Sequence, residues 1–190
     1  MKTYSISIIL GILIFSVTNS FAQTRDNFFE DKILIVLHMQ EDSANITTES
    51  DLGVINNMNK LIETFPVENV VYLKINHKIL NLTLKKFFVS ENIDDLDDQL
   101  KVVNENIFID ENGNAFSSDN LNAFLKEKEL NKIVIIGRAA EECIKNTTLK
   151  GIKKGFEMYI IPDAIIGSTE GGKRKALNKL KKKGAKEIIL

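Results

Sequence analysis

Short apolar runs recur along this chain, and stretches with helical spacing of their apolar residues separate them. An apolar run bounded by polar residues is typical of a strand buried on both faces of a parallel sheet, and strands that alternate with helices build such a sheet. We therefore predict an α/β fold of three layers, in which helices cover both faces of a mostly parallel, Rossmann-like sheet. The predicted strands are residues 32–37, 69–75, 106–109, 132–136, 157–161 and 186–190.

Helix boundaries are marked by capping and breaking residues. Pro66 stops the first helical pattern, Ser118 can cap the second, and Gly155 and Gly184 can end the last two. The expected helices cover residues 51–65, 119–127, 140–154 and 171–183. Residues 80–89 fit either an amphipathic helix or an inserted loop, and the sequence leaves both open.

The first residues have the pattern of a secretory signal peptide. Lys2 precedes an apolar stretch over residues 6–17, and Ser20 and Ala22 are small residues at the two positions that a signal peptidase reads. The apolar stretch is short beside the about 20 residues of a membrane span, so an uncleaved anchor is the weaker alternative. We expect a signal peptide over 1–22 and one exported domain over 23–190, periplasmic or secreted and free of the membrane after cleavage.

Composition narrows the partners. The formal net charge is −1, and the basic segment 173–186 has no interleaved aromatic residues, so we expect no nucleic-acid partner. The chain has 1 cysteine, which excludes an internal disulfide. After the expected signal peptide, residues 23–190 are enough for a single domain with a hydrophobic core.

The lone cysteine stands where a reactive thiol would be favoured. The apolar run 133–136 ends at Gly137, and after a short turn Cys143 falls at the start of a predicted helix. Unpaired N–H groups and the helix dipole favour a thiolate at such a position. The alternatives are a small core residue or, if the thiol is accessible, a redox sensor.

Two acids adjoin this cysteine. Carboxylates of Glu141 and Glu142 in the first turn would be stabilised by the helix dipole, but a carboxylate close to Cys143 would disfavour its thiolate. We expect both side chains to point to solvent, where the effect is small.

At this point the chain resembles a known family, the isochorismatase-like cysteine hydrolases. Residues 32–40 resemble that family's opening strand, which usually ends in Asp-x-Gln, and Ala115–Phe116 fits the segment before its nucleophile strand. Residues 137–143 are similar to its nucleophile turn, usually Gly-x-x-Thr-Asp-x-Cys. Residues 155–164 match the next strand and its Asp-Ala ending.

The resemblance implies a mechanism that uses an Asp, a Lys and a Cys, and only the cysteine matches. His38 stands in place of the Asp, and Asp110 in place of the Lys. Either the fold is retained without the chemistry, or Cys143, His38 and Asp110 form a constellation in which imidazole takes the thiol proton and the carboxylate orients the ring. The plainer interpretations are a polar strand end for His38 and a turn former for Asp110.

Further site residues follow from the same resemblance. Backbone N–H groups of Ala139, Ala140 and Cys143 are expected to form an oxyanion hole, and Gln40 and Phe116 are expected to contact the substrate.

A metal site is not expected. Nicotinamidases of the family carry an Asp-x-His metal pair after the second strand, where this chain has Ile75, Asn76 and His77. The His matches and the Asp does not. We therefore expect no metal and no other cofactor.

The resulting hypothesis is an exported cysteine hydrolase that acts through Cys143 on a small amide, ureido or vinyl-ether substrate. The alternative is a catalytically inactive domain of the same fold that binds a partner. The resemblance also leaves a homo-oligomer open.

Export predicts that the mature protein begins after Ala22, because signal peptidase cuts behind small residues. Mass spectrometry of the protein recovered after secretion should find an amino terminus at Gln23. An intact amino terminus at Met1 would contradict the prediction.

Overall fold

The computed structural model describes residues 28–41, 49–83, 86–111 and 113–190, with the backbone alone for 49–50 and 77–92. The expected signal peptide lies outside these ranges and stays a prediction. Within the described residues, no helix is both long and apolar enough to cross a membrane.

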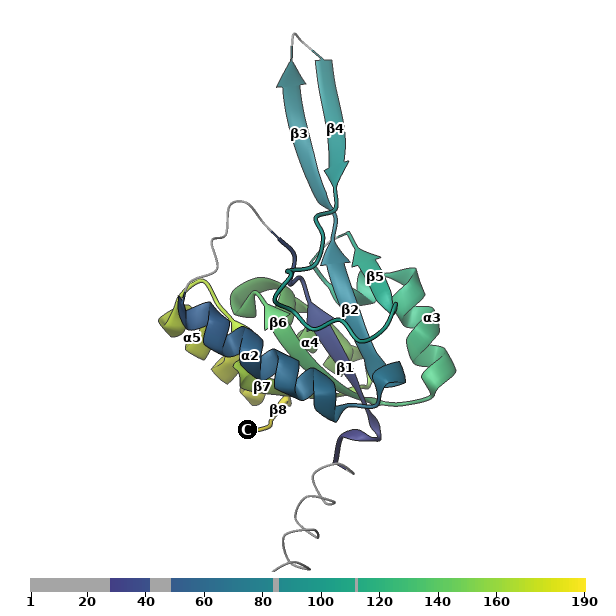
Figure 1. The fold of residues 1–190 in the computed structure, drawn as a ribbon, viewed down its shortest axis with the longest axis vertical. Coiled ribbons are helices and arrows are strands. Elements are labelled where there is room, and N and C mark those ends of the chain that lie inside the picture. Colours follow the sequence, from purple (N-terminus) through teal and green to yellow (C-terminus); the bar gives the residue numbers. More distant parts are fainter. Residues whose placement is uncertain (1–27, 42–48, 84–85, 112) are drawn as a thin grey trace, which may run out of the picture.

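A six-stranded sheet forms the middle of the molecule, in the order β5-β2-β1-β6-β7-β8 (Figure 1). All its pairings are parallel. The strands are β1 (Lys32–Leu37), β2 (Val70–Ile75), β5 (Ile107–Asp110), β6 (Lys132–Arg138), β7 (Glu157–Ile166) and β8 (Lys186–Glu187). The predicted parallel sheet is confirmed, and its carboxyl ends all meet at one edge.

Helices cover both faces of this sheet, which completes the predicted three layers. Helix α2 packs on one face, and three helices pack on the other (Figure 1). The helices are α2 (Glu49–Thr64), α3 (Asp119–Lys128), α4 (Lys145–Lys154) and α5 (Glu170–Lys182). Short 3₁₀ turns are η1 (Val67–Asn69) and η2 (Ala115–Ser117), and a π-helical turn, η3 (Ala140–Ile144), precedes α4.

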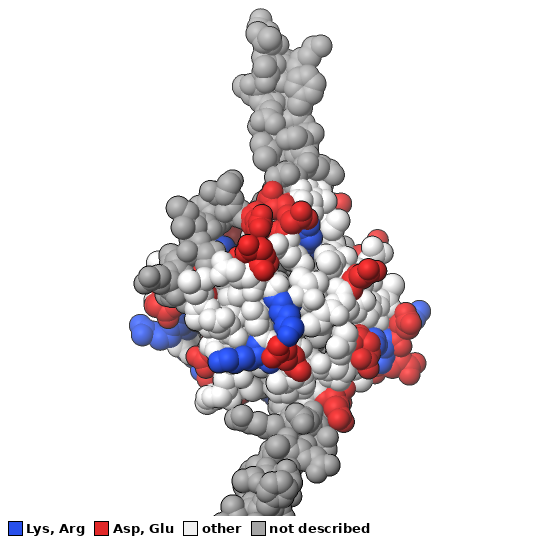
Figure 2. Space-filling model, viewed as in Figure 1, with Lys and Arg blue, Asp and Glu red and all other residues white. Residues whose placement is uncertain are grey.

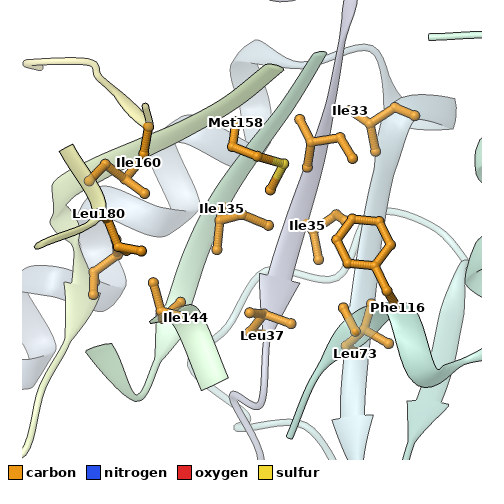
Figure 3. Close-up of a cluster of buried hydrophobic side chains, with 14 of the residues drawn as sticks. Ile33, Ile35, Leu37, Leu73, Phe116, Ile135, Ile144, Met158, Ile160 and Leu180 are labelled. Atoms are coloured by element: carbon orange, nitrogen blue, oxygen red, sulfur yellow. The ribbon is translucent and has the colours of Figure 1, made fainter. Parts of the chain in front are cut away.

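The core divides along the central strand. Every residue of β1 is buried, and alternate side chains point to opposite faces of the sheet. Ile33, Ile35 and Leu37 pack toward α3, α4 and α5 (Figure 3), whereas Leu34 and Val36 pack toward α2. This two-sided burial explains why β1 is apolar after Lys32.

The capping signals in the sequence are confirmed. Ser118 caps α3, because its hydroxyl accepts from the Leu121 N–H at 3.5 Å. Gly155 and Gly184 follow α4 and α5 with positive φ angles of 91° and 105°. Strands differ from prediction at their ends: β6 and β7 extend further, and β8 is shorter than expected.

The prediction of a helix or loop over residues 80–89 is wrong. The backbone there forms an antiparallel hairpin, β3 (His77–Thr83) and β4 (Lys86–Asn92), which projects from the body of the molecule (Figure 1). Aromatic and β-branched residues such as Phe87, Phe88 and Val89 favour strands over helices.

The acidic segment after this hairpin is tied to the chain that follows β1. Asp95 accepts from the Glu41 N–H at 2.8 Å, and the Asp97 N–H donates to Met39 at 2.9 Å. Figure 2 shows acidic side chains gathered at the upper end of the face that it displays. Lys74 pairs with the exposed Asp95 at 3.2 Å. The segment 94–98 thus lies near the edge where the sheet's carboxyl ends meet.

Glycine is required where β1 and β6 end side by side. Gly137 pairs with Leu37, and a Cβ at Gly137 would lie 2.2 Å from the Leu37 carbonyl oxygen. Its φ of 114° is also one that other residues rarely adopt.

We therefore expect Gly137→Ala to lower the free energy of unfolding by about 3 kcal/mol or more, because backbone strain and a backbone clash add. Gly53→Ala is the matched control. A Cβ there meets nothing within 4 Å, and alanine in a helix should raise the free energy of unfolding by about 0.5–1 kcal/mol. Urea denaturation of both variants measures this, and equal effects would contradict it.

Candidate active site

The candidate site lies at the carboxyl ends of the central strands, where ligand sites of open α/β sheets form. His38 follows β1, Asp110 is the last residue of β5, and Cys143 lies in η3 after β6. Parallel pairing through β2 brings these three strand ends to the same edge. The structure therefore brings together the three residues predicted for catalysis.

The centre of the site is a buried hydrogen bond between His38 and Asp110. His38 Nε2 lies 2.5 Å from Asp110 Oδ2, and the aspartate is fully buried. The other carboxylate oxygen, Oδ1, accepts from the Gly113 N–H at 2.8 Å. Because both oxygens have partners, the carboxylate is fixed in one orientation and can hold the imidazole ring in place.

The backbone of His38 is constrained as well. Its φ of 51° lies in the left-handed region, which non-glycine residues seldom adopt. The His38 N–H donates to the Leu73 carbonyl at 2.8 Å, so strand β2 holds this conformation. Such strained residues cluster at functional sites.

Cys143 reaches the pair from strand β6, on the other side of β1 from β2 and β5. It is half-buried in η3, where the Ile144 N–H donates to Ala139 at 3.1 Å. A Cβ at Gly113 would lie 3.2 Å from Cys143 Sγ, so the thiol packs against the turn that also holds Asp110. Single π-helical turns occur often at functional sites.

The charge state of His38 reflects these neighbours. Burial lowers the pKa of the imidazole, but the hydrogen bond and charge interaction with Asp110, together with the interaction with the nearby Cys143, outweigh burial and raise the pKa to about 9. His38 Nδ1 is buried and has no hydrogen-bond partner in the described part of the chain. At neutral pH the ring is thus an imidazolium, and its positive charge favours a thiolate beside it.

Backbone N–H groups are available beside the cysteine. Residues of a first helical turn have N–H groups without intrahelical partners, and η3 begins at Ala140. Ala139 is the capping residue before it and has an extended backbone. An oxyanion hole formed by Ala139, Ala140 and Cys143 remains a prediction that fits this location.

The two residues expected to contact substrate are occupied elsewhere. The Gln40 side-chain nitrogen donates to the Ile75 and Asp94 carbonyls, each at 3.2 Å, and its side-chain oxygen accepts from the Ile75 N–H at 2.6 Å. Phe116 is 5% exposed, packs in the core and stacks on Phe156 with ring centroids 5.4 Å apart. Gln40 therefore ties the segment after β4 to β2, and little of the Phe116 ring is left for a ligand.

Sequence reasoning missed Gly113 and Leu73 as supports of the site. Gly113 holds Asp110 and leaves room for the thiol, and the Leu73 carbonyl holds the His38 backbone. The Asn-Gly pair at 112–113 was a turn signal that could have indicated Gly113. A backbone carbonyl on a neighbouring strand has no such signal.

The described residues do not fit the metal pair of the family's nicotinamidases. Ile75 stands in the carboxylate position, and its side chain has no donor atom for a metal. Among the described residues, no group of three His, Cys, Asp or Glu side chains could hold a metal ion.

The fold and this cluster define a class: three-layer α/β proteins with a cysteine beside the carboxyl end of a central parallel strand. The family model of the isochorismatase domain matches residues 32–188, and the chain belongs to that family. The uncharacterized isochorismatase family protein YrdC of Bacillus subtilis (strain 168) is 25% identical over 146 residues, which are 71% of this chain and 73% of the relative.

Solved structures share the fold at low identity. An isochorismatase-like hydrolase from Alkaliphilus metalliredigens has a TM-score of 0.67 at 17% identity, covering 83% of this chain and 94% of that one. The pyrazinamidase of Pyrococcus horikoshii, solved with zinc, has a TM-score of 0.63 at 23% identity over 84% and 99%. The octameric YcaC hydrolase of Escherichia coli, of unknown specificity, has a TM-score of 0.63 at 14% identity over 84% and 76%.

The His38–Asp110 pair predicts a pH dependence of stability. The pKa of His38 is raised to about 9 in the folded protein from its ordinary value of 6.5. The resulting stabilisation is fully present below pH 6.5 and is lost as pH rises through 9, so the free energy of unfolding should fall between these values. Asp110→Asn should flatten the slope, because an amide can still accept from Gly113 but donates to neutral imidazole.

Urea denaturation between about pH 6 and 9.5 measures both slopes, since this range brackets the two pKa values of His38. The wild type and Asp110→Asn both retain Cys143, so the comparison isolates the change at Asp110. Equal slopes would contradict the role given to the pair.

Proposed function

We propose that this protein is an exported isochorismatase-like cysteine hydrolase in which Cys143 is the nucleophile, His38 the acid–base group and Asp110 the residue that orients His38. The resemblance implies a cysteine hydrolase, and solved structures of the same fold are named as hydrolases. The observation that carries the proposal is the buried 2.5 Å contact of His38 with Asp110 beside the Cys143 thiol. A Cys–His pair with an orienting carboxylate needs no lysine.

In the resting site, His38 holds the proton that the thiol has given up, so a Cys143 thiolate lies beside a His38 imidazolium. The thiolate sulfur attacks the substrate carbonyl carbon, and the carbonyl π electrons move to oxygen, where backbone N–H groups near η3 would stabilise the charge. When the oxyanion collapses, the C–N bond breaks. The leaving nitrogen takes the proton from His38, and an acyl thioester on Cys143 remains.

Hydrolysis of the thioester uses the same groups in reverse. Neutral His38 takes a proton from water as the water oxygen bonds to the acyl carbon. The C–S bond then breaks, the carboxylic acid is released, and Cys143 leaves as a thiolate beside the imidazolium. The sum is amide plus water to acid plus amine.

The substrate class we propose is a small amide, ureido or vinyl-ether compound. The chemistry above serves the two carbonyl classes, and a fold neighbour named as a pyrazinamidase acts on an amide. We place amides first for this reason. We also propose that residues 1–22 are removed on export, that 23–190 form the domain, and that it assembles as a homo-oligomer, as the octameric YcaC neighbour does.

The test begins with the thiol. His38→Ala should slow iodoacetamide alkylation of Cys143 at pH 7 by about tenfold or more, because the thiolate loses its cationic partner. Glu142→Gln is the matched control, since this exposed side chain adjoins Cys143 and makes no part of the pair. An unchanged rate in His38→Ala would sink the Cys–His pair.

The second step is a screen of small amides and ureido compounds with ammonia release as the readout. Cys143→Ser and His38→Ala should each lower kcat/KM about a hundredfold or more on any substrate found. Glu142→Gln should keep the rate. A reactive thiol without turnover would favour another substrate class, and an inert thiol would favour the binding domain.

A further inference from the structure

Glu141 is only partly exposed and bonds to the loop before α5, contrary to the expectation that both acids point to solvent; Glu142 is exposed. The Glu141 carboxylate reaches the loop before α5, where the Ser168 N–H lies 3.2 Å from Oε1 and 3.1 Å from Oε2. Negative charge is favourable at a helix N-terminus, and a backbone N–H bond to a charged acceptor is among the stronger hydrogen bonds.

Two glycines make room for this carboxylate. A Cβ at Gly172 would lie 2.4 Å from Glu141 Oε1. A Cβ at Gly167 would lie 2.7 Å from the Lys173 Cβ and 3.1 Å and 3.2 Å from the two carboxylate oxygens. Neither glycine has a positive φ, so the need is for space. We call Gly167, Ser168 and Gly172 the glycine seat. The Thr169 hydroxyl accepts from the Gly172 N–H at 3.0 Å and so fixes the seat to the start of α5.

Glu141 and Cys143 leave η3 in opposite directions. The Cys143 sulfur packs against Gly113, which follows β5 on one side of β6. The Glu141 carboxylate lies in the seat that follows β7 on the other side of β6. Glu141, two residues before Cys143, therefore anchors the turn to the start of α5 and holds its negative charge away from the thiol.

We propose that Glu141, held in the glycine seat, is a positioning residue that fixes the turn bearing Cys143 and keeps its own charge from the thiolate. This role rests on the proposed function of Cys143. It is not an acid–base role, because the carboxylate is bonded to Ser168 and faces away from the reacting sulfur.

A pair of neighbouring glycines tests the proposal without changing Glu141. Gly172→Ala places a methyl group where the carboxylate lies, whereas Gly171→Ala meets nothing within 4 Å and is the matched control. Both positions lie in the first turn of α5. Gly172→Ala should slow Cys143 alkylation at pH 7 and low salt by about threefold or more, because a displaced carboxylate near the thiol disfavours thiolate.

Salt separates this charge effect from general damage. In 1 M NaCl, where the screening length is about 3 Å, part of the lost alkylation rate of Gly172→Ala should return. Glu141→Gln in the Gly172→Ala background should also recover rate, because no charge remains to be displaced. Equal alkylation rates for Gly172→Ala and Gly171→Ala would overturn the proposal, as would a loss in Gly172→Ala that neither salt nor Glu141→Gln relieves.

Amide exchange at Ser168 measures the seat itself. Its N–H should exchange about tenfold faster or more in Gly172→Ala than in Gly171→Ala, because the charge-assisted bond to Glu141 is lost. Equal exchange would overturn the seat. A wild-type thiol no more reactive than free cysteine, with Ser168 still protected, would instead refute the hydrolase proposal and leave the seat as a structural anchor only.

Discussion

The buried hydrogen bond between His38 and Asp110 is the interaction on which the site depends. Two ionisable side chains without solvent are stable only when each satisfies the other, and losing one would leave the other unpaired at a cost of several kcal/mol. The neighbouring features serve this bond. Gly113 completes the hydrogen bonding of the carboxylate, and Leu73 holds the unusual backbone of His38. The sheet order sets the distance between β1 and β5 that the bond spans.

The strands were predictable because their environment leaves a direct mark on the sequence. Both faces of β1, β6 and most of β7 are buried, so runs of apolar residues make up most of these strands and stand out from the chain. The hairpin of β3 and β4 has no such mark, because it projects from the sheet. A short segment with mixed polarity fits more than one secondary structure, and only the register of the two strands resolves it.

The site was predictable only in part, and the dividing line is the range of the contacts. The position of Cys143 after a buried strand and a turn is local, and the resemblance to the family supplied His38 and Asp110. The packing of Phe116 against Phe156 and the use of the Gln40 amide by β2 depend on segments distant in sequence. The same holds for Glu141, whose carboxylate finds its partner on Ser168, 27 residues further on.

Charged groups around η3, the turn that bears Cys143, lie on opposite sides of strand β6. On the side of β1, β2 and β5 lies the His38 imidazolium, which favours a thiolate, and its countercharge Asp110 is separated from the sulfur by the ring that it holds. On the side of β7 lies Glu141, whose charge is balanced by the start of α5. A turn with a carboxylate two residues before its cysteine can thus support a thiolate, because each negative group has its own partner. Where the resemblance places the family's Asp and Lys, this chain has His38 and Asp110, and its turn also carries an acid. The glycine seat explains how the acid and a thiolate are compatible.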